Sequence, residues 1–235
     1  TTRQANPEII GASGFRALES AFVDDFSRFR ARDPWARLLV LVPSRTILAH
    51  LRESVVRAGI GGFQLECQLA TGLADAILSE SDTVPAPAED VAAFLVRHLA
   101  VRLADSADSR FRAVARRGGF HESLLATFRD LDESGPNLAA LQELARTANP
   151  KLAETLRLYL GWRQQLEALG LATVGQRLAL AADAAGSFRI GQPVWTYGFY
   201  DLTGNQRRLI EALSHVEHGA SGYACIADIE GERVD

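Results

Sequence analysis

The amino-terminal third of the sequence alternates short apolar runs with stretches of helical periodicity. The clearest run is Leu38–Val42, LLVLV, which lies between Arg37 and Pro43. A short run that is apolar throughout suits a central parallel strand with both faces covered. Two further strands are predicted at Glu8–Ala12 and Phe63–Leu69, and a helical pattern follows each of them. This alternation is typical of a doubly wound parallel sheet, so we expect an α/β fold.

A long stretch with helical periodicity alone interrupts this alternation. It runs from about residue 89 to residue 186, and its first apolar stripe consists of Phe94, Leu95, His98, Leu99 and Val101. Strand patterns return at Val194–Phe199 and Tyr223–Ala227, with a helix predicted at Gln206–Leu213 between them. The interruption is too long for an ordinary loop. We therefore expect a sheet domain built from residues 1–80 and 192–235, with a helical subdomain at 89–186 inserted into it.

Composition excludes several classes of function. The chain has 25 basic and 29 acidic residues and a net charge of −4, so it lacks the overall basic character of a DNA-coating protein, although a local arginine-lined groove is compatible with it. No apolar run approaches the roughly 20 residues of a membrane span, and we expect a cytoplasmic protein without a membrane partner. Two distant cysteines argue against a disulfide framework.

No catalytic or metal-binding set can be assigned from residue types and spacing. The five histidines lack metal-ligand spacing with acidic residues or cysteines, and no Ser-His-Asp or Cys-His arrangement stands out. The chain has no methionine, and only eight residues follow the last predicted strand. We therefore expect it to be a piece of a longer protein.

The segment Gly11-Ala12-Ser13-Gly14 stands between a predicted strand and a predicted helix, where a phosphate-binding loop would lie. Such a loop has the form G-x-x-x-x-G-K-[ST], in which the lysine reaches the phosphates and the hydroxyl binds magnesium. With Gly14 as the last glycine, Phe15 takes the lysine position and Arg16 the hydroxyl position, and the register that starts at Gly11 also fails. We interpret the segment as a tight turn, at which backbone N–H groups and Arg16 could still hold an anion.

A second segment, VWTYGFYDLTGNQRRLIEAL, spans Val194–Leu213. It resembles the Walker B segment of superfamily 1 helicases of the UvrD type, and it aligns without a gap. Tyr197 and Gly198 stand where that family has its Asp-Glu pair, Asp201 stands at the second Asp and Gln206 at the final Gln. The Asp-Glu pair holds magnesium and activates water in such enzymes, and both carboxylates are missing here. The alternative is a strand, turn and helix with a coincidental glutamine.

Further segments extend the resemblance from about Ile9 to Ala227. Leu38–Val55 resembles the strand and helix that carry DNA-contacting motif Ia, Gln68–Leu78 resembles motif Ib, and the helical stretch stands where these helicases place subdomain 1B. Together with the missing lysine and Asp-Glu pair, this combination resembles the AddB and RexB family. Those proteins are partners of an active helicase–nuclease subunit.

The resemblance implies a RecA-like P-loop NTPase sheet (subdomain 1A) with an inserted helical 1B subdomain, catalytically inert in this chain. It implies binding of single-stranded or duplex DNA ends in recombinational repair and an AddA-type partner subunit. It also implies a nuclease domain beyond Asp235, where magnesium and an Fe–S cluster would be bound, so no cofactor is expected here. The missing lysine argues against ATP binding. The vestigial nucleotide site would comprise Gly11, Ala12, Ser13, Gly14, Arg16, Tyr197, Gly198, Asp201 and Gln206.

Two sets of residues are candidates for contact with DNA. Ser44 and Arg45 follow the LLVLV strand, at the sheet edge where open α/β sheets bind ligands, and both could contact phosphate; the alternative is a helix cap and a solvated arginine. The second set is a basic segment with the phenylalanines Phe111 and Phe120, suited to phosphates and stacked bases. Its arginines are Arg110, Arg112, Arg116 and Arg117. The alternative places the phenylalanines in the core and the arginines on a solvated face.

Three functions therefore remain open on the sequence alone. The first is a degenerate helicase-like domain that binds DNA or the partner subunit. The second is an atypical P-loop NTPase, against which the missing lysine and Asp-Glu pair count. The third is a module that only docks another protein.

Overall fold

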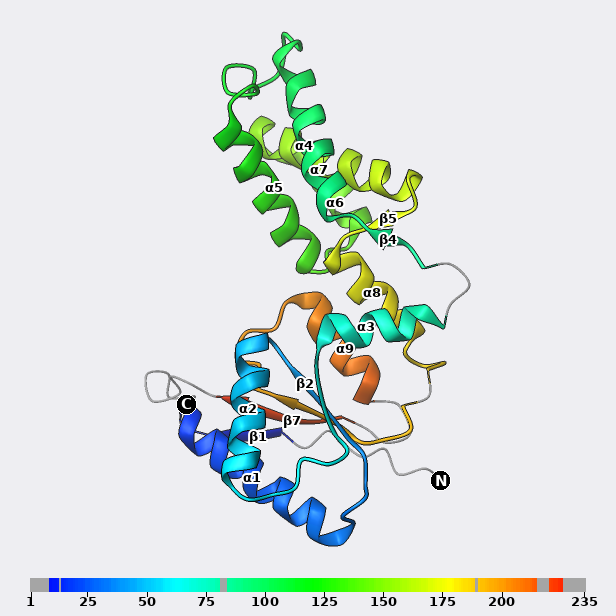
Figure 1. Cartoon of the computed structure of the whole chain (residues 1–235). Helices are drawn as coiled ribbons and strands as arrows, with labels where there is room; N and C mark the ends of the chain where they lie inside the picture. Colours follow the sequence, from blue (N-terminus) through cyan, green and yellow to red (C-terminus); the bar gives the residue numbers. More distant parts are fainter. Residues whose placement is uncertain (1–8, 13, 81–83, 189, 215–219, 226–235) are drawn as a thin grey trace. The chain divides into compact units, whose positions relative to one another are not determined.

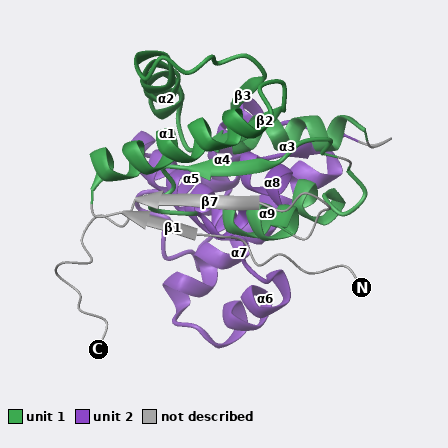
Figure 2. Cartoon of the chain, turned by 90° about the horizontal axis from the view of Figure 1, so that it is seen from below, with its two compact units in different colours: residues 1–80, 180–202, 206–235 green, residues 81–179, 203–205 purple. Residues whose placement is uncertain are grey.

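The computed structural model describes residues 9–12, 14–80, 84–188, 190–214 and 220–225. The chain forms two compact units (Figure 2). Unit 1 comprises residues 1–80, 180–202 and 206–235, and unit 2 comprises residues 81–179 and 203–205. The helical stretch was expected at 89–186, whereas unit 2 begins earlier, ends earlier and takes up three residues from the later segment.

Unit 1 contains a five-stranded sheet in which every described pairing is parallel, with the strand order β1-β7-β6-β2-β3. The α/β class predicted from the sequence is thereby confirmed. Its elements in chain order are β1 (Ile9–Ala12), α1 (Phe15–Arg32), β2 (Leu38–Val42), α2 (Arg45–Arg57), β3 (Leu65–Leu69), α3 (Ala70–Ser79), β6 (Val194–Tyr197), α9 (Gly204–Ser214) and β7 (Ala220–Cys225).

Helices cover both faces of this sheet, which is why β2 is apolar throughout. All five residues of β2 are buried. Leu38, Val40 and Val42 belong to one core cluster with α1 and α2, and the alternation along a strand turns Leu39 and Leu41 to the other face. Figure 1 shows α3 and α9 on the side of the sheet opposite α1 and α2. Along the chain, β1, β2 and β3 are placed successively toward one edge of the sheet, whereas β6 and β7 are placed successively toward the other edge. Right-handed crossovers therefore put the helices of the two halves on opposite faces.

Three predicted strand boundaries were wrong. The strand predicted at Phe63–Leu69 begins at Leu65, because Gln64 has a φ of 62° and breaks the extended chain. The strand predicted at Val194–Phe199 ends at Tyr197, because Gly198 turns the chain with a φ of 76°. The strand predicted at Tyr223–Ala227 lies at Ala220–Cys225, and positions 226 and 227 are outside the described residues.

Unit 2 is mainly helical. Its elements are β4 (Ala86–Pro87), α4 (Glu89–Ala104), α5 (Gly118–Glu133), α6 (Leu138–Thr147), α7 (Pro150–Ala168), β5 (Leu171–Ala172) and the first part of α8 (Val174–Ala184). β4 and β5 form a short parallel pair that the sequence did not predict. Strands of two residues are too short to produce an alternating pattern. Asn137 and Asn149 cap α6 and α7 by accepting hydrogen bonds from Ala140 and Leu152.

The core of unit 2 lies between α4, α5 and α7. Phe128, Tyr159 and Trp162 meet there with ring centroids 5.4–6.1 Å apart, and all three side chains are fully buried. The apolar stripe predicted for α4 was partly wrong, because Phe94 is 66% exposed and Val101 is also exposed. The buried face of α4 instead consists of Ala92, Leu95, Val96 and Ala100. Small alanines let helices approach closely, which a prediction based on large apolar residues overlooks.

Candidate functional site

The carboxyl ends of the parallel strands of unit 1 share one edge of the sheet, which is where ligands of open α/β sheets bind. This edge collects the turn after β1, the start of α2 after β2, and the turn after β6. The residues predicted for a vestigial nucleotide site lie in the first and third of these segments or in the strands and helices that flank them. Ser44 and Arg45 belong to the second.

The turn between β1 and α1 is too short to wrap phosphates. Gly11 and Ala12 were included both in the strand predicted at Glu8–Ala12 and in the segment Gly11–Gly14, and they lie in β1, paired with β7. Only residues 13 and 14 separate β1 from α1, and Ser13 lies outside the described residues. Gly14 has a φ of 100°, a backbone conformation that suits glycine, and it caps α1 without a side-chain hydrogen bond. Arg16 is exposed on the first turn of α1.

Two aromatic residues, Phe15 and Tyr197, are those that the sequence analysis aligned with a phosphate-loop lysine and a magnesium-binding aspartate. Phe15 and Tyr197 have ring centroids 6.4 Å apart. Tyr197 is fully buried in the core cluster, 5.1 Å from the ring of Phe22, and Phe15 also lies 4.9 Å from the ring of His50. A carboxylate at position 197 would be buried in the apolar core without water, whereas Phe15 is 37% exposed beside it.

Gly198, which the sequence analysis aligned with a glutamate, is required by the backbone. Its φ of 76° is one that side-chain-bearing residues rarely adopt. A Cβ atom there would lie 3.3 Å from Ile47 Cγ2, so α2 packs closely against this turn. A glutamate at this position would therefore strain the turn and crowd Ile47.

The remaining residues of this edge have different surroundings. Asp201 is exposed in the turn that follows Gly198, and Gln206 is half-buried on the first turn of α9. Ser44 caps α2, because its Oγ accepts a hydrogen bond from the backbone N–H of Ile47 at 3.2 Å. Arg45 is exposed beside it. Ser44 is thus the N-cap of α2, which was the alternative interpretation of its position.

A serine, a histidine and a glutamate also meet between α1 and α2. Ser54 donates a hydrogen bond to Glu19, and His50 Nε2 lies 3.3 Å from Glu19 Oε2 and 3.5 Å from Ser54 Oγ. The hydrogen bond from Ser54 lowers the pKa of Glu19 below its usual range. A hydrolytic triad uses both ring nitrogens of its histidine, one toward the serine and one toward the carboxylate. Here the same nitrogen, His50 Nε2, lies near both Glu19 and Ser54, and Ser54 is buried. The cluster therefore stabilises the packing of α1 against α2.

In unit 2 the four predicted arginines lie around one open hollow of about 760 Å³. All of Arg110, Arg112, Arg116 and Arg117 are exposed, and Ala104, Ser109 and Ala113 complete the lining. They come from the segment between α4 and α5. One acidic neighbour moderates the positive charge, because Arg116 pairs with Asp105 at 2.9 Å.

The phenylalanines of this segment do not form the predicted stacking surface. Phe111 is only 8% exposed, and its ring packs against that of Phe120 with centroids 5.1 Å apart. Phe120 also packs against the core of unit 2. Their placement in the core was the alternative interpretation. The hollow therefore offers positive charge without exposed rings from Phe111.

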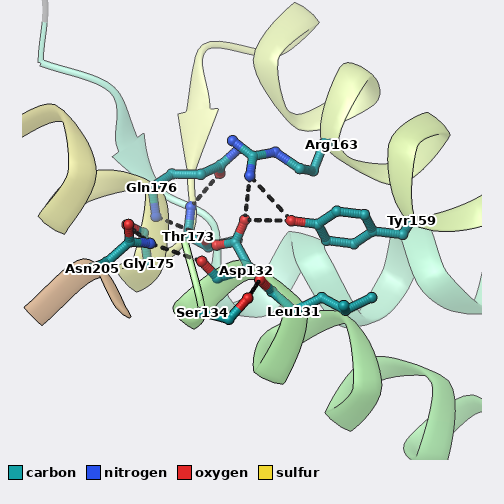
Figure 3. A network of polar contacts seen from close by, with 9 residues as sticks. All are labelled: Leu131, Asp132, Ser134, Tyr159, Arg163, Thr173, Gly175, Gln176 and Asn205. Carbon is teal, nitrogen blue, oxygen red and sulfur yellow. Dashed lines mark hydrogen bonds and ion pairs between the residues drawn. The ribbon is translucent and has the colours of Figure 1, made fainter. Parts of the chain in front are cut away.

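A buried polar network in unit 2 was not predicted (Figure 3). Asp132, 1% exposed at the end of α5, pairs with Arg163 at 2.8 Å and accepts hydrogen bonds from Tyr159 Oη at 3.2 Å and from Thr173 Oγ1. Burial raises the pKa of Tyr159 to about 12, so its hydroxyl keeps its proton. Asp132 also borders a cavity of about 240 Å³ lined by Glu133, Arg129 and Trp162.

Asn205 joins this network from α9. It is 3% exposed, and its amide donates to the backbone oxygens of Asp132 at 2.8 Å and of Gly175 at 2.9 Å. Its neighbour Gly204 lies so close to Ser134 that a Cβ atom would come within 1.9 Å of the Ser134 oxygen. The sequence predicted a role for the adjacent Gln206 and gave no indication of a role for Asn205. A polar residue early in a helix carries no sign that it is buried by a distant segment.

Within the described ranges, no group of three histidine, cysteine or acidic side chains is placed to hold a metal ion. Among the same residues, no helix has both the length and the apolar character needed to cross a bilayer.

Comparison with known proteins gives no assignment: no protein-family model matches this chain, and no curated protein matches it.

Proposed function

We propose that this chain is a helicase-shaped domain of the AddB type that binds DNA without hydrolysing ATP. It would act beside an AddA-type subunit in processing double-strand breaks for recombinational repair. The single observation that carries the DNA-binding part is the open hollow in unit 2, around which four exposed arginines gather. Exposed arginines on a concave surface suit phosphate oxygens, which accept hydrogen bonds from the planar guanidinium group.

The loss of ATP hydrolysis is supported at the sheet edge of unit 1. Phe15 and Tyr197 replace a lysine and a carboxylate with rings that pack together, and Gly198 has a backbone conformation unsuited to glutamate. The two-residue connection between β1 and α1 offers few N–H groups to a phosphate. We therefore propose that the parallel sheet serves as a scaffold here.

Binding of labelled duplex DNA by the whole chain at low salt tests the proposal. The double variant Arg112→Ala/Arg117→Ala should weaken binding about tenfold or more, because two phosphate contacts are lost. The matched control is Arg146→Ala/Arg157→Ala, which removes the same charge from exposed positions of unit 2 that do not line the hollow. We expect it to change affinity less than about twofold.

Two outcomes would contradict the proposal. If the wild-type chain fails to bind DNA even at low salt, a protein-docking module becomes the better explanation, because phosphate contacts strengthen as salt falls. If the purified chain hydrolyses Mg-ATP and loses this activity in Arg16→Ala, an atypical NTPase does.

A further inference from the structure

Two exposed aromatic rings meet at the edge of unit 1 opposite the strand ends described above. Trp35 precedes β2 and Phe63 precedes β3, so both lie at the amino ends of parallel strands. Trp35 is 73% exposed and Phe63 is 58% exposed. Their ring centroids are 5.4 Å apart and the rings are perpendicular. A large apolar side chain left in water next to another one marks a contact site more often than a single exposed residue does.

A buried arginine fixes the two loops that carry these rings. Arg30, 9% exposed, donates hydrogen bonds to the backbone oxygens of Pro34, at 3.2 Å, and Ala36, at 2.6 Å, on either side of Trp35. It also donates to the backbone oxygen of Phe63 itself. Because one guanidinium group holds both loops, the two rings are positioned together before any ligand arrives.

The segment that carries Trp35 is positively charged. Arg30 is bound to carbonyl oxygens, which carry no net charge. Arg32 and Arg37 are exposed on either side of Trp35, and Asp33 is the one acidic residue in the segment 30–37. The carboxylate of Asp33 is turned to the backbone, since it accepts a hydrogen bond from the N–H of Trp35 at 2.9 Å. An anionic ligand is therefore favoured over an apolar peptide at this place.

We propose that Trp35 and Phe63 form a stacking site for the unpaired bases of single-stranded DNA. An exposed aromatic ring accepts any base on its face, and arginines beside it hold the backbone phosphates. Bases inside a duplex are already stacked on each other, so the site discriminates between single strands and duplex. The choice of DNA as the nucleic acid rests on the proposed function, whereas the stacking site rests on the contacts of Arg30, Trp35 and Phe63.

Titration of the whole chain with a labelled oligothymidylate longer than the roughly 4–16 nucleotides of a typical single-strand site tests this inference. Trp35→Ala and Phe63→Ala should each weaken binding about tenfold, and Trp35→Phe should restore most of it, because a ring remains. The matched control is Phe94→Ala, which removes an exposed ring from unit 2 and should leave affinity unchanged. Duplex affinity should not change in any of these variants.

Tryptophan fluorescence gives a second readout that does not depend on a variant. Trp162 is fully buried and Trp195 is half-buried, so Trp35 is the tryptophan most accessible to a base. Stacking should quench its emission in step with binding, and Trp35→Phe should lose this quenching.

Several results would overturn the inference while leaving the proposed function intact. One is that Trp35→Ala binds single strands as well as wild type while Arg112→Ala/Arg117→Ala weakens both DNA forms. Another is that binding leaves the emission of Trp35 unchanged. Tighter binding of an oligouridylate by tenfold or more would overturn the assignment to DNA. Conversely, loss of binding in Trp35→Ala with no effect of the hollow variant would support the stacking site and contradict the role of the hollow.

Discussion

A single buried carboxylate, Asp132, gathers polar groups from segments that are distant in the sequence. Its side chain binds Tyr159 and Arg163 of α7 and Thr173 ahead of α8, and its backbone oxygen binds Asn205. A charge that is 1% exposed is tolerated only because these partners surround it. Removing one partner of such a pair leaves the others buried without their bonds, which costs more than the pair itself contributes.

Asp132→Ala should therefore lower the free energy of unfolding by about 3–5 kcal/mol. Asp132→Asn, which keeps an acceptor oxygen, should cost less. The control is Asp130→Ala, two positions earlier on the same helix and exposed, which should stay within about 0.5 kcal/mol of wild type. Urea denaturation followed by circular dichroism measures all three, and equal stability of Asp132→Ala and wild type would show that the network contributes nothing.

At the scale of elements, packing and backbone geometry determine which residues the strand–turn–helix segment β6–α9 accepts. β6 ends in a fully buried tyrosine, and the turn starts at a glycine with a φ of 76° against the first turn of α2. Tyr197 serves packing, and Gly198 serves backbone geometry. Carboxylates introduced at Tyr197 and Gly198 would disturb this packing and strain the turn.

Gly198→Ala should destabilise the chain by about 1 kcal/mol or more, because alanine is strained at this φ and its Cβ would crowd Ile47. Gly161→Ala is the informative counterpart. Gly161 lies inside α7, where a Cβ would meet nothing within 4 Å, so alanine should stabilise by about 0.5–1 kcal/mol. Thermal melting of both variants checks the opposite signs, and a stabilised Gly198→Ala would refute the argument about this turn.

Local patterns predicted the fold class, because covering both faces of a sheet demands a strand such as β2 that is apolar throughout. Local patterns failed where the conformation of one residue or a contact with a distant segment decides the position of a side chain. Apolar and polar residues alternate in the sequence from Phe63 onward. In the structure, Gln64 has a positive φ, and Phe63 lies exposed to solvent before the strand. The four arginines of the hollow could be grouped from sequence because they lie within one short segment. The contact of Phe15 with Tyr197 depends on the strand order, which no local pattern contains.

At the scale of the whole molecule, the net charge opposes the proposed function. The chain carries −4, so DNA is repelled on average, and only local groups of arginine can attract it. The proposed contacts are few. The hollow has four arginines, and one of them is paired with Asp105. Binding should consequently be weak at physiological salt and strong only when salt is low.

The slope of log K against log salt concentration for duplex DNA should lie between about −2 and −4, because each phosphate contact contributes roughly −0.9. Affinity measured at several salt concentrations gives this slope, and Arg112→Ala/Arg117→Ala should flatten it by about 2. A wild-type slope steeper than about −6 would mean that many more cations touch DNA than the hollow provides. A slope near zero would mean that phosphate contacts are not involved.

The three residues 203–205, which belong to unit 2 although the rest of their segment belongs to unit 1, limit how this chain can be dissected. A fragment of residues 81–179 expressed alone would lack Asn205. The backbone oxygens of Asp132 and Gly175 would then lose the hydrogen bonds that they accept from the Asn205 amide. Unit 2 is thus not a self-sufficient cassette. A fragment meant to contain all of unit 2 must also include residues 203–205, which follow β6 in the sequence.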